Sequence, residues 1–242
     1  MHLSNRLQAV ADLVTPGNRV ADIGCDHAYI SIYLVEHKIS PHVIAMDVNQ
    51  GPIDRAKENI KKYGYAGRIE TRRSDGLEKL NAGEADAVLI AGMGGGLTIQ
   101  ILTRYMDVTK SLKELILQPQ SEIHLVRRAV REMGFTITEE NMMKEDGKYY
   151  VMMRAEANAF VADKQSYEPV GEEHDYFGRL LLERRNPVLR EFLWKEEQRC
   201  RTILKALEEE PTENSLERQR EVKEMLERMD MALGYYRKGL GS

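Results

Sequence analysis

The chain has 242 residues, of which 42% are hydrophobic and 31% are charged, and its formal net charge is −4. This composition excludes a disordered chain, and the acidic balance excludes nucleic-acid binding by overall charge. The two cysteines, the lack of a Cys/His cluster and the lack of a long apolar run argue against a disulfide scaffold, a metal site and a membrane span. We therefore expect a cytoplasmic protein with no metal and no membrane partner.

The predicted elements alternate between strands and helices through residue 155. Short apolar runs predict strands, and apolar residues three or four apart predict helices. We expect a helix at 3–14, a strand at 19–24, a helix at 30–38, a strand at 42–47, a helix at 52–63, strands at 68–72 and 85–91, a helix at 97–103, a strand at 114–118, a helix at 122–133, and strands at 135–142 and 149–155. This order predicts a doubly wound, mainly parallel sheet.

The last two strands make the predicted fold class more specific. A dinucleotide-binding domain would continue with another strand–helix–strand crossover. Five strands connected by helices and closed by an antiparallel hairpin are instead typical of the class I Rossmann-like methyltransferase domain. We expect this domain, with a seven-stranded sheet, over residues 1–158.

Residues 159–242 are predicted to form a helical domain. Helical periodicity replaces the strands at 176–182 and 186–207, and a second long helix follows a break at Pro211. We expect the two long helices to pair as a coiled-coil-like hairpin. The alternative is a solvated helical cap without a binding role.

The loop after the first predicted strand carries the strongest ligand signal. Ligands of parallel α/β sheets bind at the carboxyl ends of the strands, where this strand delivers Asp22, Gly24, Cys25, Asp26 and His27. The dinucleotide pattern G-x-G-x-x-G is not met, because Asp26 stands at the second glycine and a carboxylate repels pyrophosphate. The loop fits a ligand with a cationic end, such as S-adenosylmethionine.

Acidic residues also follow the next two strands. Asp47 can accept both ribose hydroxyls, and Asp75, beside Gly76, can accept from the exocyclic amine of adenine. Taken alone, Asp47 could be a helix N-cap and Asp75 a turn residue, but their positions at successive strand ends favour one donor site. Further expected contacts of this site are Val48, Asn49, Ala91, Gly92, Met93 and Gly94.

Several stretches together resemble the bacterial tRNA adenine-N1-methyltransferases that modify position 22 of tRNA. These stretches are LSNRL (3–7), VADIGCDHAYI (20–30), AMDVNQGP (45–52), SDGL (74–77), IAGMGGG (90–96), LQPQ (117–120), EDGKYYV (145–151) and FGRLLLERRNPVLREFL (177–193). The resemblance implies S-adenosylmethionine as methyl donor, tRNA as acceptor and 1-methyladenine as product. It also implies a Rossmann-like domain followed by a coiled-coil domain, and we expect the helical domain at 159–242 to contact the tRNA.

The tips of the fourth and fifth strands bear on the atom that is methylated. The Asn/Asp-Pro-Pro-aromatic turn that exocyclic-amine methyltransferases carry is absent after Ala91. Ring N1 has an in-plane lone pair and needs no deprotonation, so alignment supplies most of the acceleration. We expect Asp26 to orient the donor or the base, with His27 assisting or only bonding the donor, and Gln118 and Gln120 to bond the base edge.

Phosphate contacts of an acidic chain must come from local clusters of arginine. Arg184 and Arg185 are favoured because Asn186 and Pro187 fix them at a helix break, whereas the arginines at 127–131 are slightly more typical of a solvated face. Tyr149 and Tyr150 either stack on a splayed-out base or pack in the hairpin. The expected RNA-binding residues are Arg6, Arg127, Arg128, Arg179, Arg184, Arg185, Tyr149 and Tyr150.

Two other functions remain open from the sequence. The first is methyl transfer to another RNA site or to a small molecule, and the second is donor binding without catalysis. The helical region and the clustered arginines favour RNA over a small molecule. The sequence does not fix the oligomeric state, and a monomer is expected.

Overall fold

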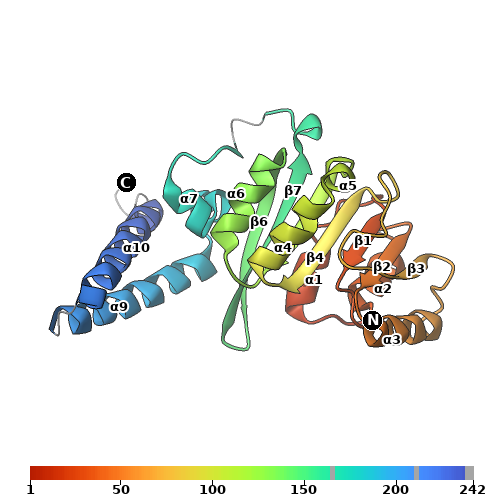
Figure 1. The fold of residues 1–242 in the computed structure, drawn as a ribbon, viewed down its shortest axis with the longest axis horizontal. Helices are drawn as coiled ribbons and strands as arrows, with labels where there is room; N and C mark the ends of the chain where they lie inside the picture. The colour runs from red at the N-terminus through yellow and green to blue at the C-terminus, as the bar shows by residue number, and fades with distance from the viewer. Residues whose placement is uncertain (164–166, 210–212, 238–242) are drawn as a thin grey trace. The chain divides into compact units, whose positions relative to one another are not determined.

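The structure, a computed structural model, describes residues 1–163, 167–209 and 213–237. The chain divides into two compact units, Met1–Glu168 and Pro169–Ser242, so the boundary falls later than the expected division between residues 158 and 159. In the described residues, the first unit contains one sheet with its helices and the second contains helices alone (Figure 1). The predicted break at Pro211 lies outside the described residues.

The first unit is built on a seven-stranded sheet with the strand order β3-β2-β1-β4-β5-β7-β6. Strands β1 to β5 are parallel, and β7 runs antiparallel to both β5 and β6. This topology confirms the predicted class I Rossmann-like methyltransferase fold. The strands are β1 (Val20–Ile23), β2 (Val43–Asp47), β3 (Ile69–Arg73), β4 (Ala87–Met93), β5 (Glu114–Pro119), β6 (Phe135–Glu145) and β7 (Lys148–Ala157).

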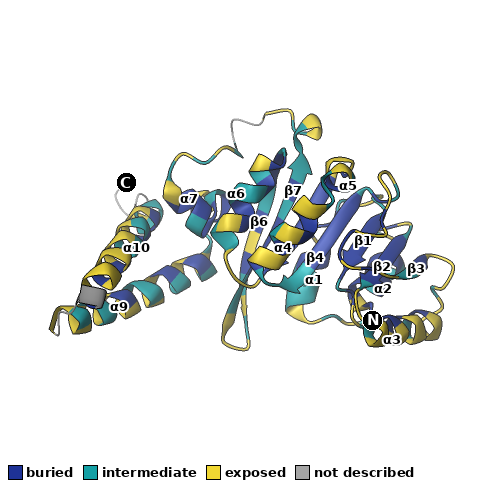
Figure 2. Cartoon of the chain, in the orientation of Figure 1, coloured by how far each residue is buried: buried dark blue, intermediate teal, exposed yellow. Residues whose placement is uncertain are grey.

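Helices cover the sheet of the first unit. The strands β1 and β5 are buried along their whole length, which explains why their apolar runs do not alternate with polar residues. Figure 2 shows β1, β2 and β4 in the buried colour and α3 largely in the exposed colour. The helices are α1 (Asn5–Ala11), α2 (Tyr29–Glu36), α3 (Gln50–Lys62), α4 (Gly95–Arg104), α5 (Met106–Lys110) and α6 (Ile123–Glu132), and a 3₁₀ turn follows at Asn158–Phe160.

The order of the strands reverses between β1 and β4. From β1 the chain proceeds outward through β2 and β3, and then returns to place β4 on the other side of β1. In open α/β sheets this switch point leaves a crevice at the carboxyl ends of the two central strands. The topology therefore places the functional site beside the end of β1.

The second unit consists of four described helices, α7 (Glu172–Phe177), α8 (Arg179–Glu183), α9 (Pro187–Glu209) and α10 (Glu213–Arg237). The single helix predicted at 176–182 is divided, because Gly178 takes a φ of 87° between α7 and α8. The helices α9 and α10 pack on each other through buried residues such as Leu193 and Met229. A helical hairpin is therefore present, as predicted.

Two features are absent from the described residues, a membrane-spanning helix and a cluster of metal-ligating side chains. No helix in these residues is long and apolar enough to cross a bilayer. The same residues contain no group of three or more side chains suited to hold a metal ion.

Candidate active site

A cavity of about 240 Å³ lies at the carboxyl end of β1, at the switch point of the sheet. Its walls come from α1, from the loop between β1 and α2, from the first turn of α2 and from the end of β4. The cavity therefore gathers all five residues that the sequence analysis named at the end of β1 and in the loop after it. The residues that line it are Arg6, Leu7, Asp22, Gly24, Cys25, Asp26, His27, Tyr29, Ile30 and Ala91.

The backbone of this loop takes an unusual conformation. Gly24, Asp26 and Ala28 all have positive φ values, of 76°, 42° and 56°. A side chain at Gly24 would meet both this backbone restriction and the terminal methyl group of Met93. Ala28 has no such freedom, and its left-handed conformation costs about 1 kcal/mol or more, whereas Asp26 tolerates this region better than alanine but less well than glycine. Contacts elsewhere must therefore hold the loop.

Helix α3 supplies two of these contacts. The guanidinium of Arg55 donates to Asp26 Oδ1 at 2.6 Å, and the amide of Asn59 donates to the carbonyl oxygen of His27 at 3.0 Å. The other carboxylate oxygen of Asp26 lies 3.5 Å from His27 Nε2, and the His27 ring stacks on Tyr29. The sequence reasoning missed Arg55 and Asn59. Their spacing of four residues on a helix that follows β2 was the available signal.

Asp22 is the one buried acid of the cavity wall. Its carboxyl group is 3% exposed and accepts a hydrogen bond from the hydroxyl of Ser31 at 2.6 Å. Burial raises the pKa of Asp22 to about 6, and the negative charge of Asp47 adds to this effect. A cation bound in the cavity would favour the charged form. Burial also raises the pKa of the Cys25 thiol, which keeps that thiol neutral.

Asp47 ends β2 close to the loop, because the neighbouring Met46 carbonyl accepts from the amides of Gly24 and Cys25. One carboxylate oxygen of Asp47 accepts from the backbone N–H of Asn49 at 2.9 Å. The N-cap position of α3 belongs to Asn49. The alternative that Asp47 caps this helix is therefore not supported. Val48, which is half-exposed, follows at the tip of the strand.

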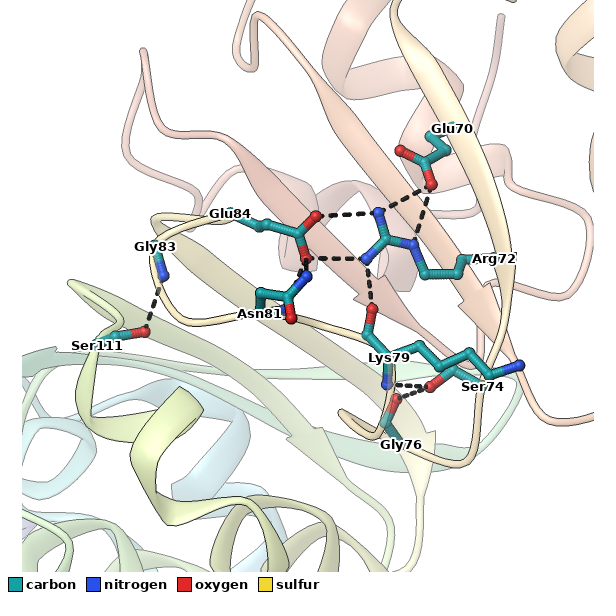
Figure 3. Close-up of polar contacts among 9 residues, drawn as sticks. All are labelled: Glu70, Arg72, Ser74, Gly76, Lys79, Asn81, Gly83, Glu84 and Ser111. Atoms are coloured by element: carbon teal, nitrogen blue, oxygen red, sulfur yellow. Dashed lines mark hydrogen bonds and ion pairs between the residues drawn. The ribbon is translucent and has the colours of Figure 1, made fainter.

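The loop that carries Asp75 is held by Arg72. Figure 3 shows the Arg72 guanidinium between the carboxylates of Glu70 and Glu84, at 2.8 and 2.9 Å, and it also donates to the carbonyl oxygen of Lys79. The Arg72 side chain therefore links β3 to the segment that connects β3 with β4. The network fixes the backbone on which Asp75 and Gly76 sit.

Asp75 itself makes an ion pair with Arg104 of α4 at 2.9 Å. Gly76 takes a φ of 56°, and a Cβ added there would press on the side chain of Ile101. Neither Asp47 nor Asp75 lines the cavity of 240 Å³. Their expected contacts with the ribose and the adenine therefore remain predictions.

The glycines at the end of β4 and the start of α4 serve two purposes, close packing and open space beside the cavity. Gly92 has a φ of 79°, and a Cβ there would lie 3.8 Å from nitrogen atoms of both Arg6 and Gln120. Gly95 packs against the backbone of Ser121, and Ser121 Oγ accepts from its N–H at 3.2 Å. Gly94 is the N-cap residue of α4 and Gly96 bonds Glu122. Of the four glycines Gly92, Gly94, Gly95 and Gly96, only Gly92 therefore leaves open space beside N–H donors, those of Arg6 and Gln120.

A cluster around Arg6 joins the cavity to the neighbouring strands. The Arg6 guanidinium donates to Gln118 Oε1 at 2.7 Å and lies 5.3 Å from the centre of the Tyr150 ring. Gln118 is completely buried, so the expectation that its amide bonds a base edge is corrected: it bonds Arg6 instead. Gln120 is exposed and stays a candidate for that contact.

The structure overturns one predicted RNA contact. Arg127 is 2% exposed, and its guanidinium forms a buried ion pair with Glu140 of β6 at 2.8 Å. A phosphate cannot reach this side chain, so the assignment of Arg127 to RNA binding was wrong. Arg128 on the same helix is half-buried. Tyr149 lies near Lys144, whereas Tyr150 lies under Arg6, as expected for neighbours on a strand.

In the second unit, two adjacent exposed arginines, Arg184 and Arg185, lie at the turn between α8 and α9. Arg184 caps the end of α8, and Arg185 has a φ of 51°. Asn186 then caps α9, because its side-chain oxygen accepts from the N–H groups of Val188 and Leu189. Arg179 is half-buried and pairs with Glu183 at 2.6 Å.

Three comparisons with known proteins bear on the function. Residues 3–153 match the family model described as a methyltransferase domain. The tRNA (adenine(22)-N(1))-methyltransferase of Bacillus subtilis is 40% identical over 157 residues, and the alignment spans 65% of this chain and 66% of that protein, just under two thirds. The solved structure of the B. subtilis tRNA methyltransferase TrmK is 32% identical with a TM-score of 0.86, and the match covers 96% of this chain and 99% of the TrmK chain.

A further solved structure contains the methyl donor. A Streptococcus pneumoniae protein, 28% identical with a TM-score of 0.81, was solved in complex with S-adenosyl-L-methionine. The match covers 96% of this chain and 100% of that one. The likeness therefore extends over both units and not over the methyltransferase domain alone.

Proposed function

Because the chain belongs to the methyltransferase domain family, and within it to the tRNA (adenine(22)-N(1))-methyltransferases, we propose that it methylates N1 of adenine 22 in tRNA. The methyl donor is S-adenosylmethionine, which supplies a methyl group activated by a sulfonium. The observation that carries the proposal is the pair of carboxylates, Asp22 and Asp26, in the wall of the cavity beside β1.

The residues of the cavity fit this donor. A site for pyrophosphate needs glycines and free N–H groups, whereas two carboxylates in one wall attract a cation. Gly24 lies in the cavity wall and has no side chain, so its backbone can come close to the bound molecule. We assign Asp47 to the ribose and Asp75 to the adenine of the donor, each through the carboxylate oxygen opposite its internal partner.

The acceptor base is assigned to the side of the cavity that faces α1 and the tip of β4. There the N–H groups of Arg6 and Gln120 surround the space that Gly92 leaves open. These donors suit ring nitrogens of adenine other than N1, so the N1 lone pair stays available for attack. Tyr150 supports Arg6 through its ring face. Catalysis then consists mainly of alignment and exclusion of water.

His27 is the candidate to receive the surplus proton of the methylated base. It lies in the cavity wall, and its Nε2 lies 3.5 Å from an Asp26 oxygen. Water is the competing acceptor.

The tRNA body is assigned to the second unit. The exposed Arg184 and Arg185 at the α8–α9 turn supply the phosphate contacts, and the helical hairpin of α9 and α10 supplies a long surface for a folded RNA. A local patch of positive charge can bind RNA although the chain as a whole has a net charge of −4.

The proposal is tested with isotopically labelled S-adenosylmethionine and bulk bacterial tRNA, followed by digestion to nucleosides. We expect the label in 1-methyladenosine. Label in a different nucleoside would show another RNA site, and label only in small molecules would show a different acceptor. Donor binding without any transfer would identify a binding protein instead of an enzyme.

A further inference from the structure

The loop that carries Asp26 and His27 is held from outside the cavity, by a helix that contributes no residue to the cavity wall. Helix α3 contributes no side chain to the cavity wall. Arg55 and Asn59 nevertheless contact the loop from one face of this helix. Both contacts join residues about thirty positions apart in the chain. Neither residue belongs to the donor site that the sequence predicted.

The need for such a restraint follows from the backbone. Ala28 takes a left-handed conformation that alanine avoids, and Asp26 takes one that aspartate adopts less readily than glycine, so the segment would relax if nothing opposed it. The Arg55 guanidinium donates a hydrogen bond to the Asp26 carboxylate at 2.6 Å. The Asn59 amide donates to the carbonyl oxygen of His27, the residue between Asp26 and Ala28, at 3.0 Å. The two contacts therefore hold the strained segment at two successive residues, Asp26 and His27.

We propose that Arg55, together with Asn59, is a positioning residue that holds the loop of residues 25–28 in the conformation that binds the methyl donor. This inference rests on the proposed function and adds to it residues that act through Asp26 and His27. Without the restraint, the donor would bind only the fraction of molecules whose loop happens to be formed, so its apparent affinity would fall by that fraction. The rate at donor saturation would change little.

The size of the effect follows from the exposure of the pair. The side chains of Arg55 and Asp26 are 47% and 57% exposed, so solvent screens their attraction. We expect the dissociation constant of S-adenosylhomocysteine to rise about threefold to fivefold in Arg55→Ala, and by a similar factor in Asn59→Ala. Arg55→Lys, which keeps the charge, should restore part of the affinity.

The test measures S-adenosylhomocysteine binding by calorimetry and the Michaelis constants for donor and tRNA in the full-length protein. Lys57→Ala is the matched control, because Lys57 is exposed on the same helix and its replacement removes the same charge as Arg55→Ala. We expect Arg55→Ala to raise KM for the donor while kcat and KM for tRNA stay within about twofold. Lys57→Ala should match the wild type in all three.

A double-mutant cycle separates positioning from a general loss of stability. Glycine adopts a left-handed turn at no steric cost, so Asp26→Gly needs no clamp and should bind better than Asp26→Ala. In the Asp26→Gly background, Arg55→Ala should change the affinity by less than about twofold. Equal losses of affinity on Arg55→Ala in the wild-type and Asp26→Gly backgrounds would overturn the inference.

The outcome also distinguishes this inference from the proposed function. Wild-type protein that binds neither S-adenosylmethionine nor S-adenosylhomocysteine would contradict the function and the inference together. Wild-type binding with unaltered affinity in Arg55→Ala would contradict the inference alone.

Discussion

Asp22 shows how one buried carboxyl can couple the stability of the fold to the binding of a cation. Its pKa rises to about 6 because the carboxyl is buried, while the hydroxyl of Ser31 offsets part of the cost. In the unfolded chain the same carboxyl loses its proton near pH 4. The folded state therefore keeps a proton over a range of pH in which the unfolded state has lost it.

This difference sets the direction of a pH dependence. A folded pKa above the unfolded value gives stability that is present at low pH and is lost as the pH rises through about 6. Between pH 5 and pH 8 this carboxyl should lower the free energy of unfolding by about 1 kcal/mol. Urea unfolding of Asp22→Asn, compared with the wild type at both values, isolates the contribution. An equal pH dependence in the two proteins would contradict it.

The same carboxyl makes a second measurement possible. A cationic donor favours the ionised form, so the affinity of the wild type for S-adenosylmethionine should increase from pH 5 to pH 7, and that of Asp22→Asn should not. Calorimetry at matched ionic strength provides the comparison. A wild-type affinity that does not change with pH would remove Asp22 from the cation site.

At the scale of the element, helix α1 connects the donor cavity with the acceptor side through Arg6. Arg6→Ala removes the charged partner of the buried Gln118 and the cation above Tyr150. We expect kcat/KM for tRNA to fall about tenfold or more and the free energy of unfolding to drop by about 1–3 kcal/mol.

The control for this helix is Asn5→Ala, since Asn5 is exposed on the same helix. It should leave both quantities near the wild-type values. Arg6→Lys should recover stability more than activity, because lysine keeps the charge and lacks the planar fork. Activity of Arg6→Ala equal to that of Asn5→Ala would exclude a role in catalysis.

The strands and most helices could be predicted because the order of apolar runs determines them. The errors are local. The expected end of β4 at Ala91 lies two residues short, and α5 was not anticipated, because five residues give too little periodicity. The division at Gly178 depends on one positive φ, which the sequence pattern alone did not reveal.

The site was predicted most completely where its residues lie next to one another in the chain, although Arg6 and Ala91 were also named as site residues and line the cavity. The loop from Asp22 to His27 is contiguous, so the pattern was visible. Arg55 reaches Asp26 across 29 positions, and Arg127 reaches Glu140 across 13. Tertiary contacts of this kind decide whether a charged side chain holds a loop, enters the core or meets a ligand.

At the scale of the whole molecule, the acidic chain must concentrate the charges that hold RNA. Arg184→Glu should weaken tRNA binding at least about tenfold and leave the affinity for the donor unchanged. Lys205→Glu is the matched control, because Lys205 is exposed on α9 and the change in net charge is the same. Filter binding at two salt concentrations gives the result. Equal weakening in both variants would assign the effect to overall charge.

The measurement that tests the central claim most directly uses two transcripts of one tRNA that differ only at nucleotide 22. With purified protein and labelled S-adenosylmethionine, the transcript with adenine should accept one methyl group at N1 of that base, and the transcript with guanine should accept none. Methylation of both transcripts, or of neither, would contradict the account.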